Sequence, residues 1–413
     1  MKIMVLAGYM SIPGLKGFEK ATSGLGYTVG RIVVELAKVD EVYVLTQSTF
    51  TKERKERGVT IVSHPVRSLI GILPSSYLRR WKEATKNVSF FSVKKYRILA
   101  YYLSGYYAER AIYRIKPDIV NIRGIGWQTD PFVLACRRTN TPFVVSLHGL
   151  NSFNKEIRCE KDIARIEREL LKEVKNNKLW ITTISTGIKR RVSEYLKVDE
   201  LKKVFVVTNG LNVDVCNQGN SSVNREMFGI ADNAIVLIYC ASMTENKNHI
   251  QLLRAYSLLS EETKKRINIL FVGDGGEKEY LLNYCTYAGI KDRVVFVGRV
   301  DKRRVSEYYG IADINVLISY SEGFGNSFIE GFAHGLPSIT FGDLDAVKDI
   351  YNEGAVVVAK ERTDQSLAEA ISIAVNNDWD TDYIREYSKK YDTREMINKY
   401  RNIFEMCIEE SRV

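Results

Sequence analysis

Short apolar runs rich in β-branched residues alternate with longer helical patterns along the whole chain, and they fall into two series. The first series starts at IMVLAGY and ends at VFVVTNG, and the second starts at AIVLIYCAS and ends at AVVVA. Such alternation is typical of parallel sheets built from βαβ units. A chain of 413 residues is also too long for a single hydrophobic core of ordinary size. The sequence therefore predicts two doubly wound α/β domains in tandem.

A polar segment, residues 211–230, separates the two series. It is rich in Asn and Ser and lacks sustained periodicity, which is typical of a linker. We place the boundary near Val215, which gives a first domain over residues 1–215 and a second over residues 216–391. Residues 392–413 predict a helix with one apolar stripe, and we expect that stripe to pack back onto the first domain.

Composition argues against several classes of protein. No stretch approaches the roughly 18 to 20 consecutive apolar residues of a membrane-spanning helix. The short apolar run at the N-terminus has the β-rich character of a first strand, so we expect it to be retained rather than cleaved as a signal peptide. The six cysteines form no C-x-x-C pair and have no His at metal-ligand spacing, so neither a disulfide framework nor a zinc site is indicated. A reducing cytoplasm fits this pattern best.

The segment with the most chemical information is SYSEGFGNSFIEGFAHGLPSIT, residues 319–340. A buried strand is followed by a Gly-rich loop that contains Glu322 and by a helix that contains Glu330. Open α/β sheets bind ligands at the carboxyl ends of their strands, and amides at a helix N-terminus bind phosphate. We expect Glu322 to face the hydroxyls of a sugar and Glu330 to accept from two ribose hydroxyls. The amides expected to hold a diphosphate belong to Phe324, Gly325, Asn326 and Ser327.

The string EGFGNSFIEGFAHGLPSI resembles the motif of two Glu separated by seven residues in retaining GT-B glycosyltransferases of family 4, the glycosyl transferases group 1 type. Other positions match this family in order, so the resemblance covers nearly the whole chain. It implies a GT-B fold, in which two Rossmann-like domains face a cleft, with the donor mainly on the second domain and the acceptor mainly on the first. It also implies transfer of a sugar from a nucleoside-diphosphate sugar to a glycan or lipid-linked acceptor in polysaccharide or glycolipid biosynthesis. Retention of anomeric configuration, no cofactor and no obligatory metal are further implications.

One position departs from the family pattern. The strand AIVLIYCAS and the turn MTENKN resemble the place where the family has an Arg and, five residues later, a Lys at the donor diphosphate. Lys247 stands at the Lys position, but Ser242 stands at the Arg position. The diphosphate clamp is then either weaker or completed by another cation, for which Arg299 and Arg303 are candidates. Without the resemblance, a Lys in a polar turn is more often a solvated surface charge.

The first domain offers candidates at the ends of its predicted strands. Gly24 and Gly26 lie where a helix begins, as in a dinucleotide-binding site. The second strand, however, ends in Gln47 and has no acidic residue for a ribose, which argues against such a site. The family uses a similar Gly-rich turn near the donor diphosphate and the acceptor. His148 resembles the family's strand-end His that contacts donor sugar or acceptor, although a packed core His is the alternative. Arg123 ends another strand and is a candidate acceptor contact.

Glu322, Lys247 and His148 are thus the expected catalytic residues. A D-x-D pair, Asp343 and Asp345, would hold a divalent metal in a different class of transferase. Here it follows a strand of the second domain where the resemblance predicts an ordinary loop before a helix, so we interpret it as capping and solvated acid. The sequence predicts no metal site.

The net charge of +10 is concentrated in one segment, because residues 67–116 contain eleven Lys or Arg and only two Glu. About ten aromatic residues are interleaved with these cations, a mixture that suits the surface of an anionic membrane. One interpretation is therefore a cytoplasmic protein in peripheral contact with the inner face of a membrane that holds a lipid-linked acceptor. The other is a helical face packed on the first sheet with solvated cations outside. No nucleic-acid-binding motif accompanies the charge, so we expect no nucleic-acid partner.

Two other functions fit the two-domain layout. A non-catalytic partner that binds a nucleotide sugar and scaffolds or activates another transferase is favoured by Ser242. A nonhydrolysing sugar epimerase shares the layout, but the segment with Glu322 and Glu330 fits it poorly. The intact Glu322, Glu330 and Lys247 favour a glycosyltransferase.

Overall fold

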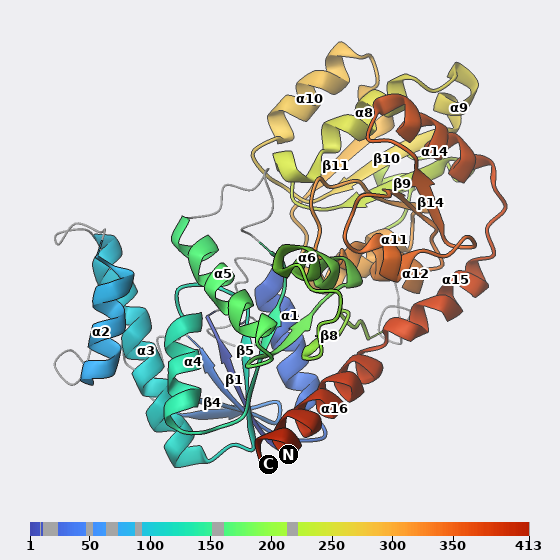
Figure 1. Ribbon diagram of the computed structural model, residues 1–413. Coiled ribbons are helices and arrows are strands. Elements are labelled where there is room, and N and C mark those ends of the chain that lie inside the picture. Colours follow the sequence, from blue (N-terminus) through green and yellow to red (C-terminus); the bar gives the residue numbers. More distant parts are fainter. Residues whose placement is uncertain are drawn as a thin grey trace. The chain divides into compact units, whose positions relative to one another are not determined.

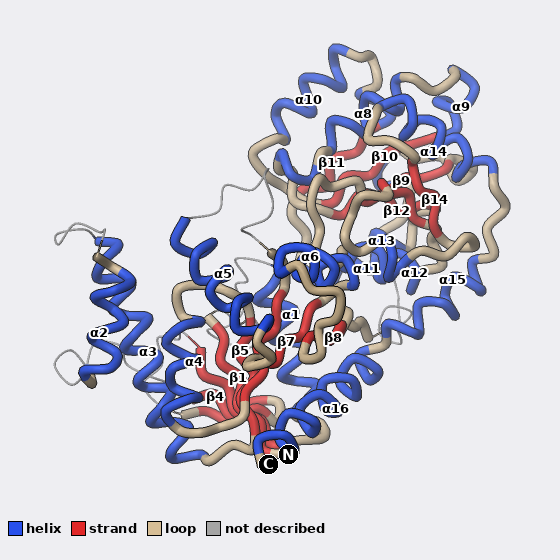
Figure 2. Tube along the Cα trace, in the orientation of Figure 1, coloured by secondary structure: helices blue, strands red, loops and turns tan. Residues whose placement is uncertain are grey.

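The computed structural model describes residues 1–8, 10, 24–46, 53–62, 73–86, 93–150, 161–212 and 222–412. The chain divides into two units (Figures 1 and 2). The first unit comprises Met1–Ile184, Ile188–Val207 and Met396–Val413, and the second comprises Ser185–Gly187 and Thr208–Glu395. The boundary that we expected near Val215 lies outside the described residues, and the long second segment of the first unit ends at Val207.

The first unit is built on an eight-stranded sheet with the order β3-β4-β2-β1-β5-β6-β7-β8. All neighbouring pairs are parallel except β3 with β4. The chain builds outward from β1 on one side and resumes with β5 on the other, so the order reverses between β1 and β5. The strands are β1 (Lys2–Ala7), β2 (Glu41–Thr46), β3 (Arg54–Glu56), β4 (Val59–Val62), β5 (Ile119–Arg123), β6 (Phe143–Leu147), β7 (Trp180–Thr183) and β8 (Val204–Val206).

Helices supply the rest of the first unit. They are α1 (Gly24–Leu36), α2 (Ser75–Ala84), α3 (Val93–Ile115), α4 (Thr129–Arg138), α5 (Lys161–Lys175), most of α6 (Thr186–Leu196) and most of α16 (Thr393–Ser411). The α2–α3 pair carries the described part of the basic segment (Figure 1).

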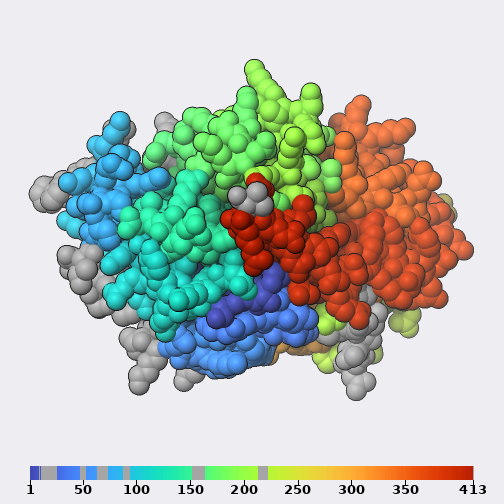
Figure 3. Space-filling model, turned by 60° about the horizontal axis from the view of Figure 1, so that its bottom comes forward, coloured from blue at the N-terminus to red at the C-terminus, as the bar shows by residue number. Residues whose placement is uncertain are grey.

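The C-terminal helix α16 packs on the same face of the sheet as α1. Alternate residues of β1, among them Ile3 and Val5, share one hydrophobic cluster with Tyr400 and Phe404 of α16. The apolar positions of α16 recur every three or four residues, which places them on one stripe of the helix. In Figure 3 the C-terminal residues accordingly lie against the N-terminal ones. The two ends of the chain therefore build one core.

The second unit is built on a six-stranded, all-parallel sheet with the order β11-β10-β9-β12-β13-β14. Its order reverses between β9 and β12, which pair with each other although 73 residues separate Cys240 from Ile314 along the chain, counting the intervening positions 241–313. All six residues of β10 are buried, as expected for a strand that is covered on both faces. The strands are β9 (Ile235–Cys240), β10 (Ile267–Val272), β11 (Val294–Gly298), β12 (Ile314–Leu317), β13 (Ser338–Phe341) and β14 (Val356–Ala359).

The helices of the second unit include several short ones. They are α8 (His249–Ser257), α9 (Glu261–Arg266), α10 (Lys278–Tyr287), α11 (Val305–Tyr309), α12 (Asn326–Ala333), α13 (Val347–Ile350), α14 (Asp364–Asn376) and α15 (Thr381–Ser388), with 3₁₀ turns η2 (Glu226–Phe228), η3 (Glu245–Lys247), η4 (Lys291–Arg293), η5 (Lys302–Arg304) and η6 (Lys389–Tyr391). Two of the 3₁₀ turns, η3 and η5, carry the cations discussed below.

Candidate active site

The Gly-rich loop after β12 delivers the chain to the N-terminus of α12. Gly325, the residue before this helix, has φ of 75°. A Cβ atom on Gly325 would lie 2.5 Å from Leu317 Cδ2 and 3.0 Å from the ring of Phe328, so a larger residue would not fit without a shift. The turn leaves the first N–H groups of α12 without partners inside the helix, as at any helix N-terminus. Two of them, those of Asn326 and Ser327, belong to the four amides that we expected to hold a diphosphate.

Lys247 and Glu322 meet at the point where the order of the second sheet reverses. Lys247 ends η3 after β9, Glu322 lies in the loop after β12, and Lys247 Nζ contacts Glu322 Oε1. Both side chains are about one-fifth exposed, at 20% and 19%. Ligands of open α/β sheets bind at such a reversal. The structure thus brings together two of the three residues that we expected to be catalytic.

Hydrogen bonds to backbone carbonyls hold these two loops in place. Asn246 Nδ2 donates to the carbonyl of Ser321 at 3.1 Å, and the amide of Tyr320 donates to the carbonyl of Asn246 at 2.8 Å. The hydroxyl of Tyr239 donates to the carbonyl of Lys247 at 2.5 Å. The Lys247–Glu322 pair is therefore presented by a fixed pair of loops rather than by two independent ones.

Glu330 meets a cation that sequence reasoning missed. Glu330 lies in α12, is only 7% exposed, and its Oε1 contacts Nζ of Lys302 in η5. The imidazole of His334 bonds the carbonyl of Glu330 at 2.8 Å and stacks on Tyr309. We call Lys247, Glu322, Glu330 and Lys302 the switch-point cluster. No sequence signal singled out Lys302, because its partner lies 28 residues away.

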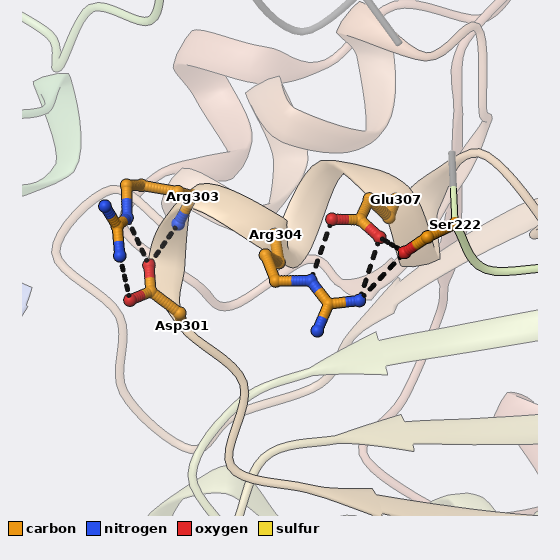
Figure 4. A network of polar contacts seen from close by, with 5 residues as sticks. All are labelled: Ser222, Asp301, Arg303, Arg304 and Glu307. Atoms are coloured by element: carbon orange, nitrogen blue, oxygen red, sulfur yellow. Dashed lines mark hydrogen bonds and ion pairs between the residues drawn. The ribbon is translucent and has the colours of Figure 1, made fainter. Parts of the chain in front are cut away.

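The cations named in advance as substitutes for the missing Arg lie elsewhere. Arg303 forms two hydrogen bonds of 2.9 Å with the carboxylate of Asp301, and these hold the pKa of Asp301 down at about 2 (Figure 4). Arg299 is exposed just after β11, and Ser242 is exposed after β9. Arg303 is therefore bound to its own loop, and Lys302 is the member of η5 that reaches the switch-point cluster.

A second residue that the sequence analysis did not single out, Arg362, fixes the end of β12. Its guanidinium donates to the carbonyls of Ile318 and Ser319, each at 3.1 Å, and to both oxygens of Asp343 at 2.9 and 2.6 Å. The side chain of Asp343 is 59% exposed, as expected for a solvated acid, and it is also the ion-pair partner of Arg362. Asp345, by contrast, is 8% exposed. Within the described residues, no group of three or more His, Cys, Asp or Glu is arranged to hold a metal ion.

A series of buried side-chain hydrogen bonds connects α12 to α11 and β12. Tyr309 donates to Ser327 Oγ at 3.1 Å, and Ser327 donates to Asn315 Oδ1 at 2.9 Å. Asn209 Nδ2 donates to Asn326 Oδ1 at 2.9 Å. The side chain of Phe324 is 1% exposed and contacts the ring of Tyr391, so this residue can offer a ligand its backbone but little of its side chain.

The first unit presents a different strand-end group. Arg123 is 2% exposed, donates from Nη1 to the hydroxyl of Tyr400 at 2.8 Å, and lies 4.3 Å from the centre of that ring. Its Nε and Nη2, and Nε2 of His148, are buried and have no hydrogen-bond partner in the described part of the chain. Burial and the nearby Arg123 lower the pKa of His148 to about 3, so this imidazole is neutral at physiological pH.

Two further sequence predictions fall in the first unit. Gly24 and Gly26 lie in the first turn of α1, and residues 11–23 before them lie outside the described ranges.

In the basic segment, Tyr77 and Tyr102 are buried in a cluster with Trp127, as the packed-helix interpretation requires, whereas Tyr96 is 57% exposed. Residues 67–72 and 87–92 of that segment are not described. None of the helices in the described ranges combines the length and apolar character needed to cross a membrane.

Comparison with known families gives two matches that lie side by side along the chain. The family described as Glycosyltransferase Family 4 matches residues 22–215, and the family described as Glycosyl transferases group 1 matches residues 220–391. The second match contains all four residues of the switch-point cluster.

Individual relatives are more distant. An uncharacterized glycosyltransferase of Methanocaldococcus jannaschii is 25% identical over 224 residues, which is 53% of this chain and 56% of that protein. D-inositol 3-phosphate glycosyltransferase 2 of Catenulispora acidiphila is 33% identical over 145 residues, which is 33% of this chain and 34% of that protein. The similarity thus spans little more than half of the first relative and a third of the second.

Solved structures match over nearly the full length. A glycosyltransferase from Rickettsia africae has a TM-score of 0.69 at 19% identity, with 98% of this chain and 99% of that chain covered. HepE from Anabaena in complex with UDP has a TM-score of 0.68 at 15% identity, with 98% and 100% covered. Together with the two parallel sheets, these likenesses confirm the GT-B fold that the sequence predicted.

Proposed function

Because this chain belongs to the group 1 glycosyltransferases of the family 4 type, we propose that it transfers a sugar from a nucleoside-diphosphate donor to a hydroxyl of a glycan or lipid-linked acceptor. The observation that carries the proposal is the switch-point cluster, in which Lys247, Glu322 and Glu330 gather at the carboxyl ends of β9 and β12 beside the N-terminus of α12. Polysaccharide or glycolipid biosynthesis is the proposed setting.

The chemical roles follow from charge. Glu330 would accept hydrogen bonds from the ribose, and Glu322 from the sugar hydroxyls, since carboxylates form strong charge-assisted hydrogen bonds. Lys247 and the free amides of α12 would stabilise the negative charge that develops on the departing nucleoside diphosphate. Lys247 must then exchange its contact with Glu322 for one with phosphate.

We further propose retention of anomeric configuration without a cofactor or an obligatory metal. The leaving phosphate can accept the proton of the acceptor hydroxyl, so the chemistry does not require a separate general base. The neutral imidazole of His148 can donate or accept a hydrogen bond, which suits a role in orienting a hydroxyl of either substrate. Arg123 remains the proposed acceptor-side residue, and Gly24 and Gly26 remain proposed donor contacts.

Calorimetric titration of UDP, GDP, ADP and TDP tests the donor site. UDP comes first because the Anabaena HepE structures contain UDP and, in one case, UDP-glucose. We expect Glu330→Ala to weaken binding by about 10- to 150-fold, since a hydrogen bond to a charged group is worth roughly 1.5–3 kcal/mol. Glu307→Ala is the matched control, because Glu307 binds Arg304 and Ser222 instead. Wild-type affinity in Glu330→Ala would refute the assignment.

A non-catalytic partner of another transferase is the second candidate function, and Ser242 at the usual Arg position is the observation that favours it. The two functions separate in a donor-hydrolysis panel run with whichever nucleotide binds. Transfer or hydrolysis above the background rate supports the enzyme. Tight nucleotide binding without any turnover, across the sugars of that nucleotide series, would support the partner.

We propose peripheral contact of α2 and α3 with the inner, cytoplasmic face of an anionic membrane as the route to a lipid-linked acceptor. Exposed Tyr96 and the surplus of basic residues in this region support the proposal, while buried Tyr77 and Tyr102 restrict the contact to the outer face. Each basic residue near such a surface contributes about 1 kcal/mol. Co-sedimentation with anionic and neutral vesicles at physiological salt tests it, and absence of any preference for the anionic vesicles would remove the membrane role.

A further inference from the structure

The switch-point cluster is balanced in charge only because of Lys302. Two carboxylates, Glu322 and Glu330, face two ammonium groups, Lys247 and Lys302. With Ser242 in place of a cation, removing Lys302 would leave one ammonium against two carboxylates. A nucleoside diphosphate, itself multiply negative, would then approach a cluster of its own sign, which opposes binding.

The three consecutive cations of η5 have different partners. Arg303 bonds Asp301, and Arg304 bonds Glu307 and Ser222, so both guanidinium groups are held by carboxylates outside the cluster (Figure 4). Lys302 alone of the three contacts Glu330 in the described structure. Its side chain is 41% exposed while that of Glu330 is 9% exposed, so the lysine reaches inward from a solvent-accessible position.

The position of Glu330 places this ammonium near the helix N-terminus. Glu330 lies four residues after Asn326, the first residue of α12, which corresponds to about 6 Å along a helix. A phosphate bound at the first amides of α12 would therefore lie within reach of a Lys side chain that contacts Glu330. A Lys chain has four rotatable methylene links, so Nζ can move from the carboxylate to a phosphate when a ribose occupies Glu330.

We infer that Lys302 is the second cation of the donor site, taking the part that an Arg at position 242 would otherwise play at the diphosphate. The inference rests on the proposed function. It identifies Lys302 as a determinant of affinity for the phosphates and not for the nucleoside.

The test compares a nucleoside diphosphate with its own nucleoside. The probe is whichever of UDP, GDP, ADP and TDP binds the full-length wild type, and calorimetry gives Kd for that nucleotide and for the matching nucleoside. We expect Lys302→Met to weaken binding of the diphosphate by about 10- to 100-fold, the range for a charge-assisted hydrogen bond, and binding of the nucleoside by less than about threefold. Lys302→Arg should retain most of the affinity.

Matched variants distinguish a specific role of Lys302 from a general effect of removing a positive charge. Arg304→Met removes the same charge two residues away, and Arg303→Met removes it one residue away; we expect each to change Kd by less than about threefold. Ser242→Arg should restore most of the affinity when combined with Lys302→Met, because position 242 is exposed and would again carry a cation after β9. Thermal unfolding of each variant shows whether the protein remains folded.

Three outcomes overturn the inference alone, while the wild type still binds a nucleotide. Unchanged diphosphate affinity in folded Lys302→Met does so directly. Equal weakening for nucleoside and diphosphate would mean that Lys302 acts only through Glu330. An equally large loss in Arg303→Met would return the role to that residue. If the wild type binds none of the four nucleotides, the proposed function fails and the inference fails with it. Failure of the proposed function is thus distinguished from failure of the Lys302 assignment by the wild-type titration.

Discussion

The two sheets differ in how charged side chains are neutralised at the point where the strand order reverses. In the second unit each buried or half-buried carboxylate of the switch-point cluster contacts an ammonium group. In the first unit Arg123 lies fully buried at the end of β5, where the ring and hydroxyl of Tyr400 hold it. Its Nε and Nη2 have no hydrogen-bond partner among the described residues. The comparison teaches that similar strand ends can present either exchangeable ion pairs or a cation fixed by an aromatic ring.

The difference has a physical consequence. An ion pair at a partly exposed site can exchange one partner for a charged ligand at modest cost, because water screens the intermediate. A buried cation has no such freedom, since losing its remaining partner leaves an uncompensated charge. We therefore expect variants of the switch-point cluster to change activity, and variants around Arg123 to change stability.

The largest effect should come from Lys247→Met. Removing a cation that stabilises charge on the leaving group should lower kcat by about 100- to 1000-fold, as for loss of one oxyanion donor. The measurement is the initial rate with the donor identified by titration. Lys264→Met, which removes a cation that is 21% exposed and paired with Glu261, is the control. A Lys247→Met enzyme with wild-type kcat would end the proposed role of the Lys247–Glu322 pair.

Glu322→Gln should lower turnover by more than it weakens nucleotide binding. The amide keeps the shape of Glu322 but loses the charge that Lys247 contacts, so a sugar hydroxyl meets a poorer acceptor. We expect a decrease in kcat of about 10- to 150-fold, the equivalent of 1.5–3 kcal/mol, with Kd for the nucleotide within about threefold. The reverse pattern would assign Glu322 to the nucleotide instead.

Tyr400→Phe tests the other side of the comparison. It removes the hydroxyl that accepts from Arg123 and leaves another buried donor of a charged group unsatisfied, which should destabilise the first unit by about 1.5–3 kcal/mol. Tyr43→Phe is the control, because its hydrogen bond to Glu41 is exposed and should contribute less than about 0.5 kcal/mol. Urea unfolding measures both. Equal midpoints for the two variants would show that the ring alone holds Arg123.

The smallest effect concerns pH. Burial, with a contribution from Arg123, lowers the pKa of His148 to about 3, while the unfolded chain keeps its ordinary value near 6.5. Below pH 6.5 the unfolded state binds a proton that the native state does not, so this contribution to stability is complete above pH 6.5 and decreases as pH falls toward 3. Relative to His148→Gln, the wild type should lose about 1.4 kcal/mol between pH 7.5 and 5.5. Parallel stability curves would show that His148 is solvated.

The sequence anticipated those parts of the site that depend on local order. The hydrophobic runs and Gly325 predicted a strand, a Gly-rich turn and a helix in this order. That order placed Glu322 in the loop and Glu330 in the helix. Lys247 after β9 was found through the resemblance to family 4, because by itself a Lys in a polar turn is more often a solvated surface charge. The two α/β domains also followed from the alternation of strands and helices, since that alternation leaves few topologies available. The GT-B fold was implied by the resemblance to family 4.

Pairings between distant residues were beyond the sequence. Of the three consecutive cations, Arg303 was named as a candidate and Lys302 was not. The sequence does not show which of them bonds Asp301 nearby and which contacts Glu330, 28 residues away. Arg362 reaches Ile318 across 44 residues for the same reason.

By itself, then, the sequence determined which elements form and which strand ends carry polar side chains, because hydrophobic period and Gly placement act over a few neighbouring residues. Only the tertiary structure decided which charges meet. Arg123 and Tyr400 are 277 residues apart, and they touch because α16 packs on the sheet whose β5 ends in Arg123. Such contacts depend on strand order and helix packing, which bring together groups that no local pattern relates.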